Sequence, residues 1–432
     1  MAKQSTLERV AILGGARIPF CRNNTAYADI GNKEMGVKAV GAAVEQFGLH
    51  KQRLGEVAYG AVIKHSRDWN LAREITLSSG LDEHTPGITL QRACGTSLDA
   101  AIIIANKIAV GQIDSGIAGG SDTTSDVPIV FRDSFAKRIL ETARARTMMD
   151  RLKAWSGFGP DELKPSFPGV AEPRTGMSMG EHCELMAKEW EISREDQDEL
   201  ALASHHNLAK SYESGFQDDL VVRFRGVERD NILRGDSSLE KLASLKPAFD
   251  KKSGRGTLTA GNSTPLTDGA SCALLASEGW AKEQGHEPMA YLVDAQVSAV
   301  DFVAGEGLLM APTYAVAELL RKHKLKFSDF DFFEIHEAFA AQVLCTLAAW
   351  ESKEYCKEKL GLRSALGAID RSKLNVNGSS LAAGHPFAAT GTRILPVAAK
   401  LLKENGGGRC LISVCTAGGM GVAAIVERPK DA

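Results

Sequence analysis

The sequence predicts an α/β fold made of two similar halves, with a separate segment inserted into the first half. Short apolar runs that end near glycine alternate with helix-like segments, which is the pattern of buried strands joined by helices. The composition changes over residues 131–165, where Arg and Lys are mixed with Leu, Met, Trp and Phe. The alternation of strand and helix resumes after residue 290, so the second half echoes the first.

The first half contains the clearest strand and helix signals. Residues 8–14, 56–63 and 114–122 are predicted as short buried strands. Residues 96–110 are apolar on nearly every face and are followed by Gly111, which predicts a buried helix with glycine just past its end. Cys94 is then expected immediately before the N-terminus of this helix.

The insert and the second half also carry recognisable elements. Residues 193–215 predict a helix, because Ser193 supplies a capping signal and Gly215 a stop. The second half is predicted to contain strands at 290–300, 410–414 and 421–428, helices at 313–323 and 389–404, and a strand leading into a helix over 330–350. In each half a strand leads to a reactive residue near the start of a helix, which indicates an internal duplication.

Length and charge limit the classes of function. A chain of 432 residues with 44% hydrophobic residues can form about three domains of roughly 150 residues. The net charge of −3, from 51 basic and 54 acidic residues, creates no field that favours nucleic acid or an anionic membrane. We therefore expect no nucleic-acid partner, and a substrate phosphate would need a local basic patch.

The eight cysteines are scattered, without a CxxC pair or His/Cys spacing typical of zinc fingers. This argues against both a disulfide framework and a structural metal, so no metal site is expected. Unpaired cysteines are typical of a reducing compartment, so a cytoplasmic location is expected. The start MAKQSTLERVAIL has no apolar signal core, no segment is apolar enough to span a membrane, and the ending PKDA is not a peroxisomal signal.

Two cysteines and a histidine lie in glycine-rich surroundings and suggest carbonyl chemistry through a thioester. Cys94, in QRACGTS, would precede a helix whose dipole and free amides stabilise a thiolate. His385 lies between Gly384 and Pro386, which suits an imidazole held to accept a thiol proton. Cys415 follows LISV and precedes TAGGMG, so it could carry a proton. The residues alone also allow two ordinary core cysteines and a structural histidine.

His336, in EIHEAFA, follows a predicted strand and is expected to begin a helix with Glu337 in its first turn. There it could bind a water or polarise a carbonyl, or it could have no role beyond the helix start. The other histidines, including His182, His205 and His206, are predicted to be solvated. GMGVAA at 419–424 loosely fits a dinucleotide fingerprint but runs into a strand, which argues against a nicotinamide dehydrogenase.

Taken together, the chain resembles the thiolase family over most of its length. The motifs that carry this resemblance agree in order and spacing: ARIPF, QRACGTS, AGGSD, MGEHCELMAKEW with SREDQDELA, LKPAFD, TAGNSTPLTDGAS, HEAFAAQ, GHPFAATG and CTAGGMG. The resemblance implies a five-layer α-β-α-β-α fold from two duplicated halves with an inserted loop domain. The implied boundaries are 1–125 with 264–289 for the N-terminal half, 126–263 for the insert, which would bind coenzyme A (CoA), and 290–432 for the C-terminal half.

The resemblance also implies roles for individual residues. Cys94 would be the acyl-accepting nucleophile, His385 its activating base, and Cys415 the acid and base at the acetyl-CoA carbanion. His385 and a water held by His336 would form one oxyanion hole, and the backbone amides of Cys94 and Ala417 a second one. CoA would be a co-substrate, with no permanently bound cofactor, and the implied contacts are Arg234 at the nucleotide end, Phe249 and Phe339 in the pocket, and Ala260 with Thr264 along the pantetheine.

Three positions depart from the common family pattern. His336 stands where asparagine is frequent, and this form resembles the β subunits of fatty-acid oxidation complexes, which favours longer 3-ketoacyl-CoA substrates. Ala417 stands where glycine is common, but its amide remains a donor. Thr264 stands where serine is usual.

The expected function is therefore degradative: an acetyl-CoA C-acyltransferase that cleaves 3-ketoacyl-CoA with CoA through an acyl-cysteine. The alternatives are a short-chain acetyl-CoA acetyltransferase, a ketosynthase, which uses two histidines and is disfavoured by Cys415, and a non-catalytic subunit of an oxidation complex. The expected partners are further copies of the chain, in a dimer or tetramer, and a hydratase/dehydrogenase α subunit. The basic, apolar segment 131–165 would shape the acyl channel or dock a partner.

Overall fold

The computed structural model describes residues 7–430. The strands are β1 Val10–Arg17, β2 Cys21–Arg22, β3 Glu56–Gly60, β4 Gly87–Leu90, β5 Ser115–Asp122, β6 Val130–Phe131, β7 Pro165–Ser166, β8 Thr267–Ser277, β9 Ala290–Ala299, β10 Phe332–Ile335, β11 Gly408–Thr416 and β12 Met420–Arg428. The α-helices are α1 Asn32–Gln46, α2 Leu71–Ser78, α3 Thr96–Ala109, α4 Asp133–Arg144, α5 Met148–Ala154, α6 Met179–Glu189, α7 Arg194–Glu213, α8 Leu239–Ala243, α9 Glu278–Glu283, α10 Ala311–His323, α11 Ala340–Glu351, α12 Lys353–Glu358, α13 Ser380–Ala383 and α14 Thr390–Glu404.

The strand order shows the duplication that the sequence predicted. The large sheet runs β10-β11-β12-β9-β1-β8-β5-β3-β4. From the centre outward, β1-β8-β5-β3 and β9-β12-β11-β10 have the same pairings: two antiparallel contacts followed by one parallel contact. The short antiparallel pairing of β1 with β9 joins the two half-sheets.

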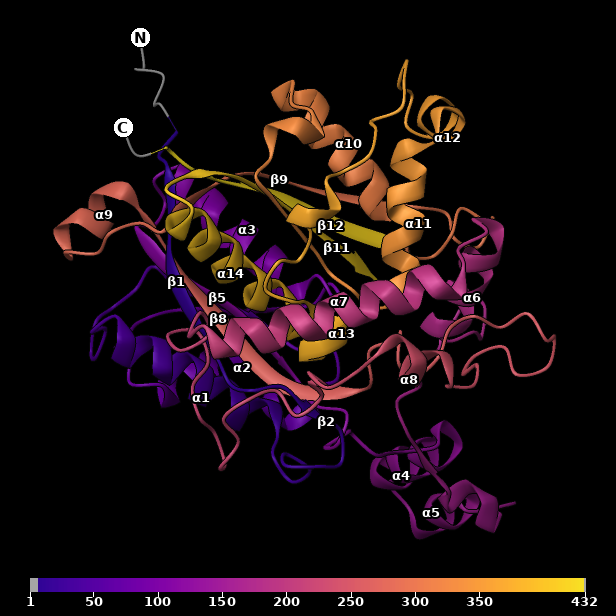
Figure 1. Ribbon diagram of the computed structural model, residues 1–432. Helices are drawn as coiled ribbons and strands as arrows, with labels where there is room; N and C mark the ends of the chain where they lie inside the picture. The colour runs from indigo at the N-terminus through magenta and orange to yellow at the C-terminus, as the bar shows by residue number, and fades with distance from the viewer. Residues whose placement is uncertain (1–6, 431–432) are drawn as a thin grey trace.

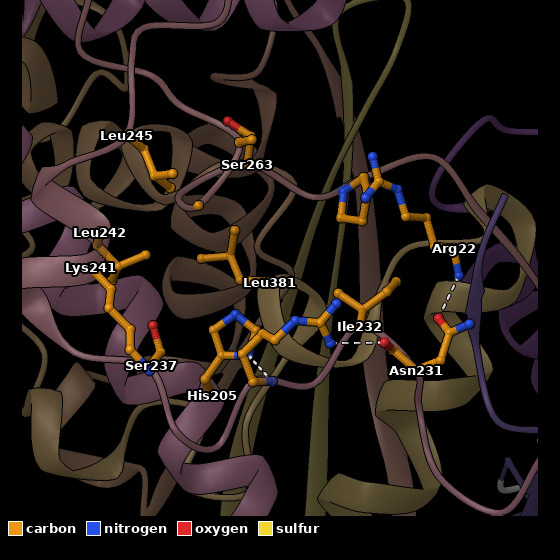
Figure 2. A pocket seen from close by; sticks show the side chains of 14 residues that line it. Arg22, His205, Asn231, Ile232, Ser237, Lys241, Leu242, Leu245, Ser263 and Leu381 are labelled. Carbon is orange, nitrogen blue, oxygen red and sulfur yellow. Dashed lines mark hydrogen bonds between the residues drawn. The ribbon is translucent and has the colours of Figure 1, made fainter. Parts of the chain in front are cut away.

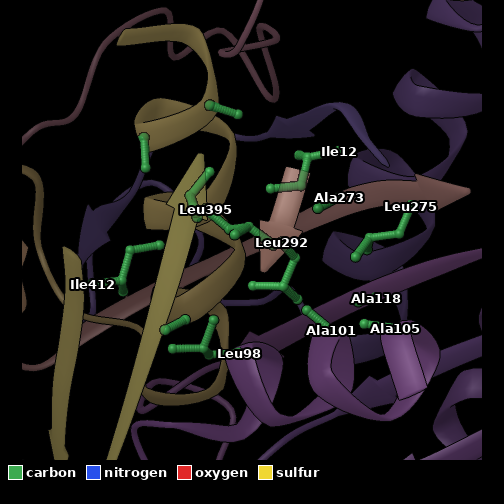
Figure 3. Close-up of a cluster of buried hydrophobic side chains, with 14 of the residues drawn as sticks. Ile12, Leu98, Ala101, Ala105, Ala118, Ala273, Leu275, Leu292, Leu395 and Ile412 are labelled. Carbon is green, nitrogen blue, oxygen red and sulfur yellow. The ribbon is translucent and has the colours of Figure 1, made fainter. Parts of the chain in front are cut away.

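Helices separate and cover the two half-sheets, which gives the expected five layers (Figure 1). α3 and α14 pack on each other in the middle, with α1 and α2 outside one half-sheet and α10 and α11 outside the other. The central core joins Leu98 of α3 and Leu395 of α14 to Ile12 and Ile412 of the two half-sheets (Figure 3). Gly391 permits this close approach, because a Cβ there would lie 2.2 Å from the Leu98 backbone nitrogen.

The insert lies between the end of β5 and the start of β8, and its two parts differ in burial. The helices α6 and α7 pack on α11 and α13 and contribute to the core. The predicted helix at 193–215 is present as α7, and the Ser193 side chain accepts a hydrogen bond from the Asp196 amide. By contrast, α4 and α5 contain no buried residue and project from the body of the molecule (Figure 1).

Most predicted elements occur within two or three residues of their expected bounds. The strand predicted at 56–63 ends earlier, at Gly60. The reason is tertiary, because the amides of Val62 and Ile63 bond to the Asp122 carboxylate and not to a neighbouring strand. Within residues 7–430, no helix is long and apolar enough to cross a membrane.

Candidate active site

Cys94 lies in a tight turn between β4 and α3. The Gly95 amide donates to the Arg92 carbonyl, and the Arg92 amide donates to Thr96 Oγ1 at 2.8 Å. Ala93 adopts a left-handed φ of 43°, a conformation that costs a non-glycine residue about 1–3 kcal/mol and is often found at functional sites. The turn leaves the Cys94 side chain partly exposed at the N-terminal end of α3.

His385 comes from the opposite half of the molecule and meets Cys94 directly. Its Nε2 lies 3.0 Å from Cys94 Sγ, and its Nδ1 lies 2.5 Å from Thr390 Oγ1. Gly384, with a φ of 100°, sets the chain direction just before the histidine, as the sequence suggested. The thiol and the imidazole are therefore placed for direct proton transfer, with Thr390 fixing the ring.

Burial of Cys94 and His385 acts against the thiolate that the start of α3 was expected to stabilise. Burial raises the pKa of Cys94 to about 12, although the amides of Ala417 and of Cys94 itself lower it. Burial, followed by the charge of Arg393, lowers the pKa of His385 to about 3. Desolvation thus opposes the effect of the helix N-terminus, and transfer of the proton to His385 requires that the developing charge be stabilised.

Cys415 is at the end of β11, before the turn that leads into β12. It is 1% exposed, and burial together with the nearby Cys94 charge holds its pKa well above the usual range. A thiol in this state keeps its proton and can deliver it to a carbanion. The turn after β11 places the Ala417 amide next to Cys94. A hydrogen bond from this amide lowers the Cys94 pKa.

His336 is in a loop and not at a helix start, which corrects the prediction. β10 ends at Ile335 and α11 begins at Ala340, so Glu337 is not in the first helical turn either. The His336 ring lies 4.1 Å from that of His385, centroid to centroid. The His336 amide also donates to the Ser413 carbonyl at 2.8 Å, so both backbone and ring are held beside the end of β11 and His385.

Ser380 connects His336 to a buried arginine. Ser380 Oγ lies 2.7 Å from His336 Nδ1 and accepts a hydrogen bond from Arg393 at 2.9 Å. Because a guanidinium only donates, Ser380 Oγ is free either to donate its hydrogen to His336 Nδ1 or to accept one from it. When Ser380 donates, the ring hydrogen of His336 is on Nε2, which is buried and has no partner among the described residues. This N–H can donate to a water or a substrate oxygen.

Two buried carboxylates hold the loops of the site. Glu172, between β7 and α6 of the insert, accepts a hydrogen bond from the Gly418 amide at 2.6 Å and so holds the turn that contains Ala417. Asp122, at the end of β5, accepts the Ala388 amide at 2.8 Å close to His385. Burial raises the pKa of Asp122 to about 7 in spite of its three amide donors. Sequence reasoning missed both as site residues, as it missed Thr390, Ser380 and Arg393.

A cavity of about 320 Å³ lies between the insert and the body of the molecule (Figure 2). Its lining includes Arg22, Arg234 and Lys241, and among the apolar residues Ile232 and Leu381. Asp230, which binds Arg17 of β1 through two hydrogen bonds of 2.6 and 2.8 Å, anchors the chain just before Arg234. The cavity thus combines three cations with an apolar wall, which suits a phosphorylated, partly apolar ligand.

The predicted CoA contacts are divided between this cavity and its surroundings. Arg234 and Ala260 line the cavity. Thr264 does not, and its hydroxyl donates to the Ala338 carbonyl at 3.0 Å. Phe249 and Phe339 pack edge-to-face at 5.8 Å in a cluster that also contains Cys415. This aromatic pair therefore borders the region of the cysteines.

Two of the histidines predicted to be solvated are buried. His205 lines the cavity and accepts the Arg234 amide at Nδ1, and burial followed by the charge of Arg234 lowers its pKa to about 4. His182 is also buried and lies 2.7 Å from Thr175 Oγ1. His206 alone of the three is exposed. His182 and His205 lie on the covered faces of α6 and α7, whereas neighbours such as Glu181 and His206 lie on the exposed faces.

The sequence matches two family models and many named proteins. The family models described as the thiolase N-terminal and C-terminal domains match residues 10–279 and 286–428. The chain is 42% identical over 426 residues to proteins named 3-ketoacyl-CoA thiolase from Shewanella baltica and Shewanella oneidensis, covering 97% of each chain.

Solved structures of similar proteins match the fold over nearly the whole chain. The acetyl-CoA acetyltransferase of Bacillus anthracis matches 98% of this chain and 99% of its own, with a TM-score of 0.80 and 31% identity. Human mitochondrial 3-ketoacyl-CoA thiolase matches with a TM-score of 0.81 and 26% identity, over 98% of this chain and 100% of its own.

Proposed function

Because this chain belongs to the thiolase family and is an acyltransferase, we propose that it is a 3-ketoacyl-CoA thiolase of fatty-acid β-oxidation. It takes 3-ketoacyl-CoA and CoA and releases acetyl-CoA and an acyl-CoA shortened by two carbons. The observation that carries the proposal is the 3.0 Å contact between Cys94 Sγ and His385 Nε2, with Cys415 beside it. Nucleophile, base and proton carrier are then present in one site.

The first half of the proposed reaction forms an acyl-enzyme. His385 takes the Cys94 proton as the sulfur attacks the 3-keto carbon, and the amides of Cys94 and Ala417 bind the resulting oxyanion. Collapse of this tetrahedral adduct breaks the bond between C2 and C3 of the substrate and leaves an acyl group on Cys94. The electron pair passes to C2 and the thioester oxygen of the departing acetyl-CoA, which protonated His385 and a water on His336 stabilise.

The second half restores the enzyme. Cys415 gives its proton to C2 and completes acetyl-CoA, and the proton that His385 took from Cys94 then passes to Cys415, which leaves His385 neutral. The thiol of a second CoA attacks the acyl-Cys94 carbonyl, its proton passes to His385 and on to the Cys94 sulfur, and the shortened acyl-CoA leaves. The raised pKa of Cys94 and the lowered pKa of His385 fit this scheme, because charge separates only while oxyanion donors can compensate for it.

Measured thiolysis rates across 3-ketoacyl-CoAs of short, medium and long chain test this function. We expect kcat/KM to be higher for medium or long substrates than for acetoacetyl-CoA, in line with His336 and with the relatives named 3-ketoacyl-CoA thiolase. A preference confined to acetoacetyl-CoA would instead support the second candidate, a short-chain acetyl-CoA acetyltransferase, which the Bacillus anthracis structure favours.

The cavity between the insert and the body is the proposed site for the CoA nucleotide. Arg22→Ala and Arg234→Ala are each expected to raise the KM for CoA roughly tenfold, because each removes a charged contact of about 1.5 kcal/mol or more. The kcat value is expected to change little, since neither residue reaches the cysteines. The matched control is Arg223→Ala, an exposed arginine outside the cavity. An equal KM shift in the control would contradict the assignment.

We also propose a role for the projecting part of the insert, an oligomeric state and a cellular location. The projecting segment exposes Met148, Met149 and Leu152 beside its basic residues, which supports a role in shaping the acyl channel or in docking an α subunit. We also propose a homo-oligomer, dimer or tetramer. A reducing cytoplasm is supported by the eight cysteines, all of which are unpaired.

A further inference from the structure

Three potential metal ligands lie close together in the site: Cys94, His336 and His385. Cys94 Sγ and one ring nitrogen of each histidine lie within 4.8 Å of one another, and Cys94 Sγ to His385 Nε2 is 3.0 Å. In a tetrahedral zinc site with Zn–S near 2.3 Å and Zn–N near 2.0 Å, ligand atoms are about 3.3–3.6 Å apart. The observed separations bracket this range, so small side-chain shifts would form the site.

Both histidines already have the outer contacts that ligand histidines need. The nitrogens that face away from the metal would be the Nδ1 atoms, and each has a hydroxyl partner: Thr390 for His385 and Ser380 for His336. Such contacts orient the ring and fix its tautomer in metal sites. For His336 the ring hydrogen is then on Nδ1, where Ser380 Oγ has a second lone pair to accept it.

A metal site also requires ligand atoms that are free to bind the ion and a path by which the ion reaches them. His336 Nε2 is buried and unpartnered among the described residues, so a metal displaces no protein contact there. Cys94 is partly exposed, which gives an ion access to the thiol. Binding releases the Cys94 proton to solvent and leaves both histidines neutral, so one proton is released for each ion bound.

We propose that Cys94, His336 and His385 form a binding site for a thiophilic divalent ion such as Zn²⁺, which reversibly blocks the nucleophile. The three side chains leave a fourth tetrahedral position open for water, as in catalytic zinc sites. This site goes beyond the proposed acyl transfer, because an ion held on the Cys94 sulfur prevents that sulfur from attacking a substrate.

Titration of the full-length, metal-free protein with Co²⁺ tests the site without an activity measurement. We expect one Co²⁺ per chain and a thiolate-to-cobalt charge-transfer band in the near ultraviolet. Cys94→Ser, which keeps the size of the side chain, is expected to abolish the band. His336→Asn is expected to weaken Co²⁺ binding at least about tenfold. Zn²⁺ should displace Co²⁺ and bleach the band.

Cys415→Ser is the matched control, because it changes a second buried thiol next to Cys94 that is not one of the three ligands. Its Co²⁺ band is expected to persist. A band that survives in Cys94→Ser, or the absence of any band in the unchanged protein, would overturn the proposal. Both outcomes are independent of whether the protein cleaves 3-ketoacyl-CoA.

Discussion

Cys94→Ala is expected to lower thiolysis by on the order of 10⁶-fold, the scale found when a catalytic nucleophile is removed. Cys94 Sγ is the thiol that lies 3.0 Å from His385 Nε2, so the variant lacks the proposed acceptor of the acyl group. The measurement is the steady-state rate together with the mass of protein quenched after mixing with 3-ketoacyl-CoA. The unchanged protein should gain one acyl group on Cys94, and the variant none.

Cys356→Ala is the matched control, since it removes a buried thiol of α12 whose sulfur bonds to the carbonyls of Ala349 and Trp350. It should keep both the rate and the acyl adduct. Normal turnover by Cys94→Ala would refute the acyl-cysteine mechanism, and an acyl adduct on a different cysteine would reassign the nucleophile.

Cys415→Ala is expected to separate the two halves of the reaction. Cleavage of the C2–C3 bond should fall about 10²–10⁴-fold, the usual contribution of a general acid. Exchange of labelled CoA into acetyl-CoA should fall far less, because acyl transfer to and from Cys94 breaks no carbon–carbon bond. Both rates can be measured on one preparation, together with hydrogen exchange at C2 of acetyl-CoA, which should also be lost.

Parallel losses in cleavage and CoA exchange would contradict this division of roles. They would indicate that Cys415 supports the packing around Cys94 and not the proton at C2. Cys415→Ser separates these cases further. It preserves the small polar side chain, but a hydroxyl at that site is a much weaker acid than a thiol, so cleavage should remain slow while exchange is near normal.

Local sequence was sufficient to predict the main elements. The strands and helices around Cys94, His385 and Cys415 follow from apolar periodicity and from glycine and capping signals, which depend on neighbours in the chain. The resemblance to thiolases then supplied the five-layer fold. The helix expected at His336 was misplaced, because the four residues from His336 to Phe339 continue as a loop before α11.

The sequence by itself determined which residues could react: Cys94, His385, Cys415 and His336 are visible from their motifs. Tertiary structure alone decided what surrounds them. Ser380 and Arg393 bond to each other and orient His336, and burial raises the pKa of the Cys94 thiol. The physical reason is that desolvation and hydrogen bonding depend on every atom nearby, and Cys94 and His385 meet across 291 positions of the chain.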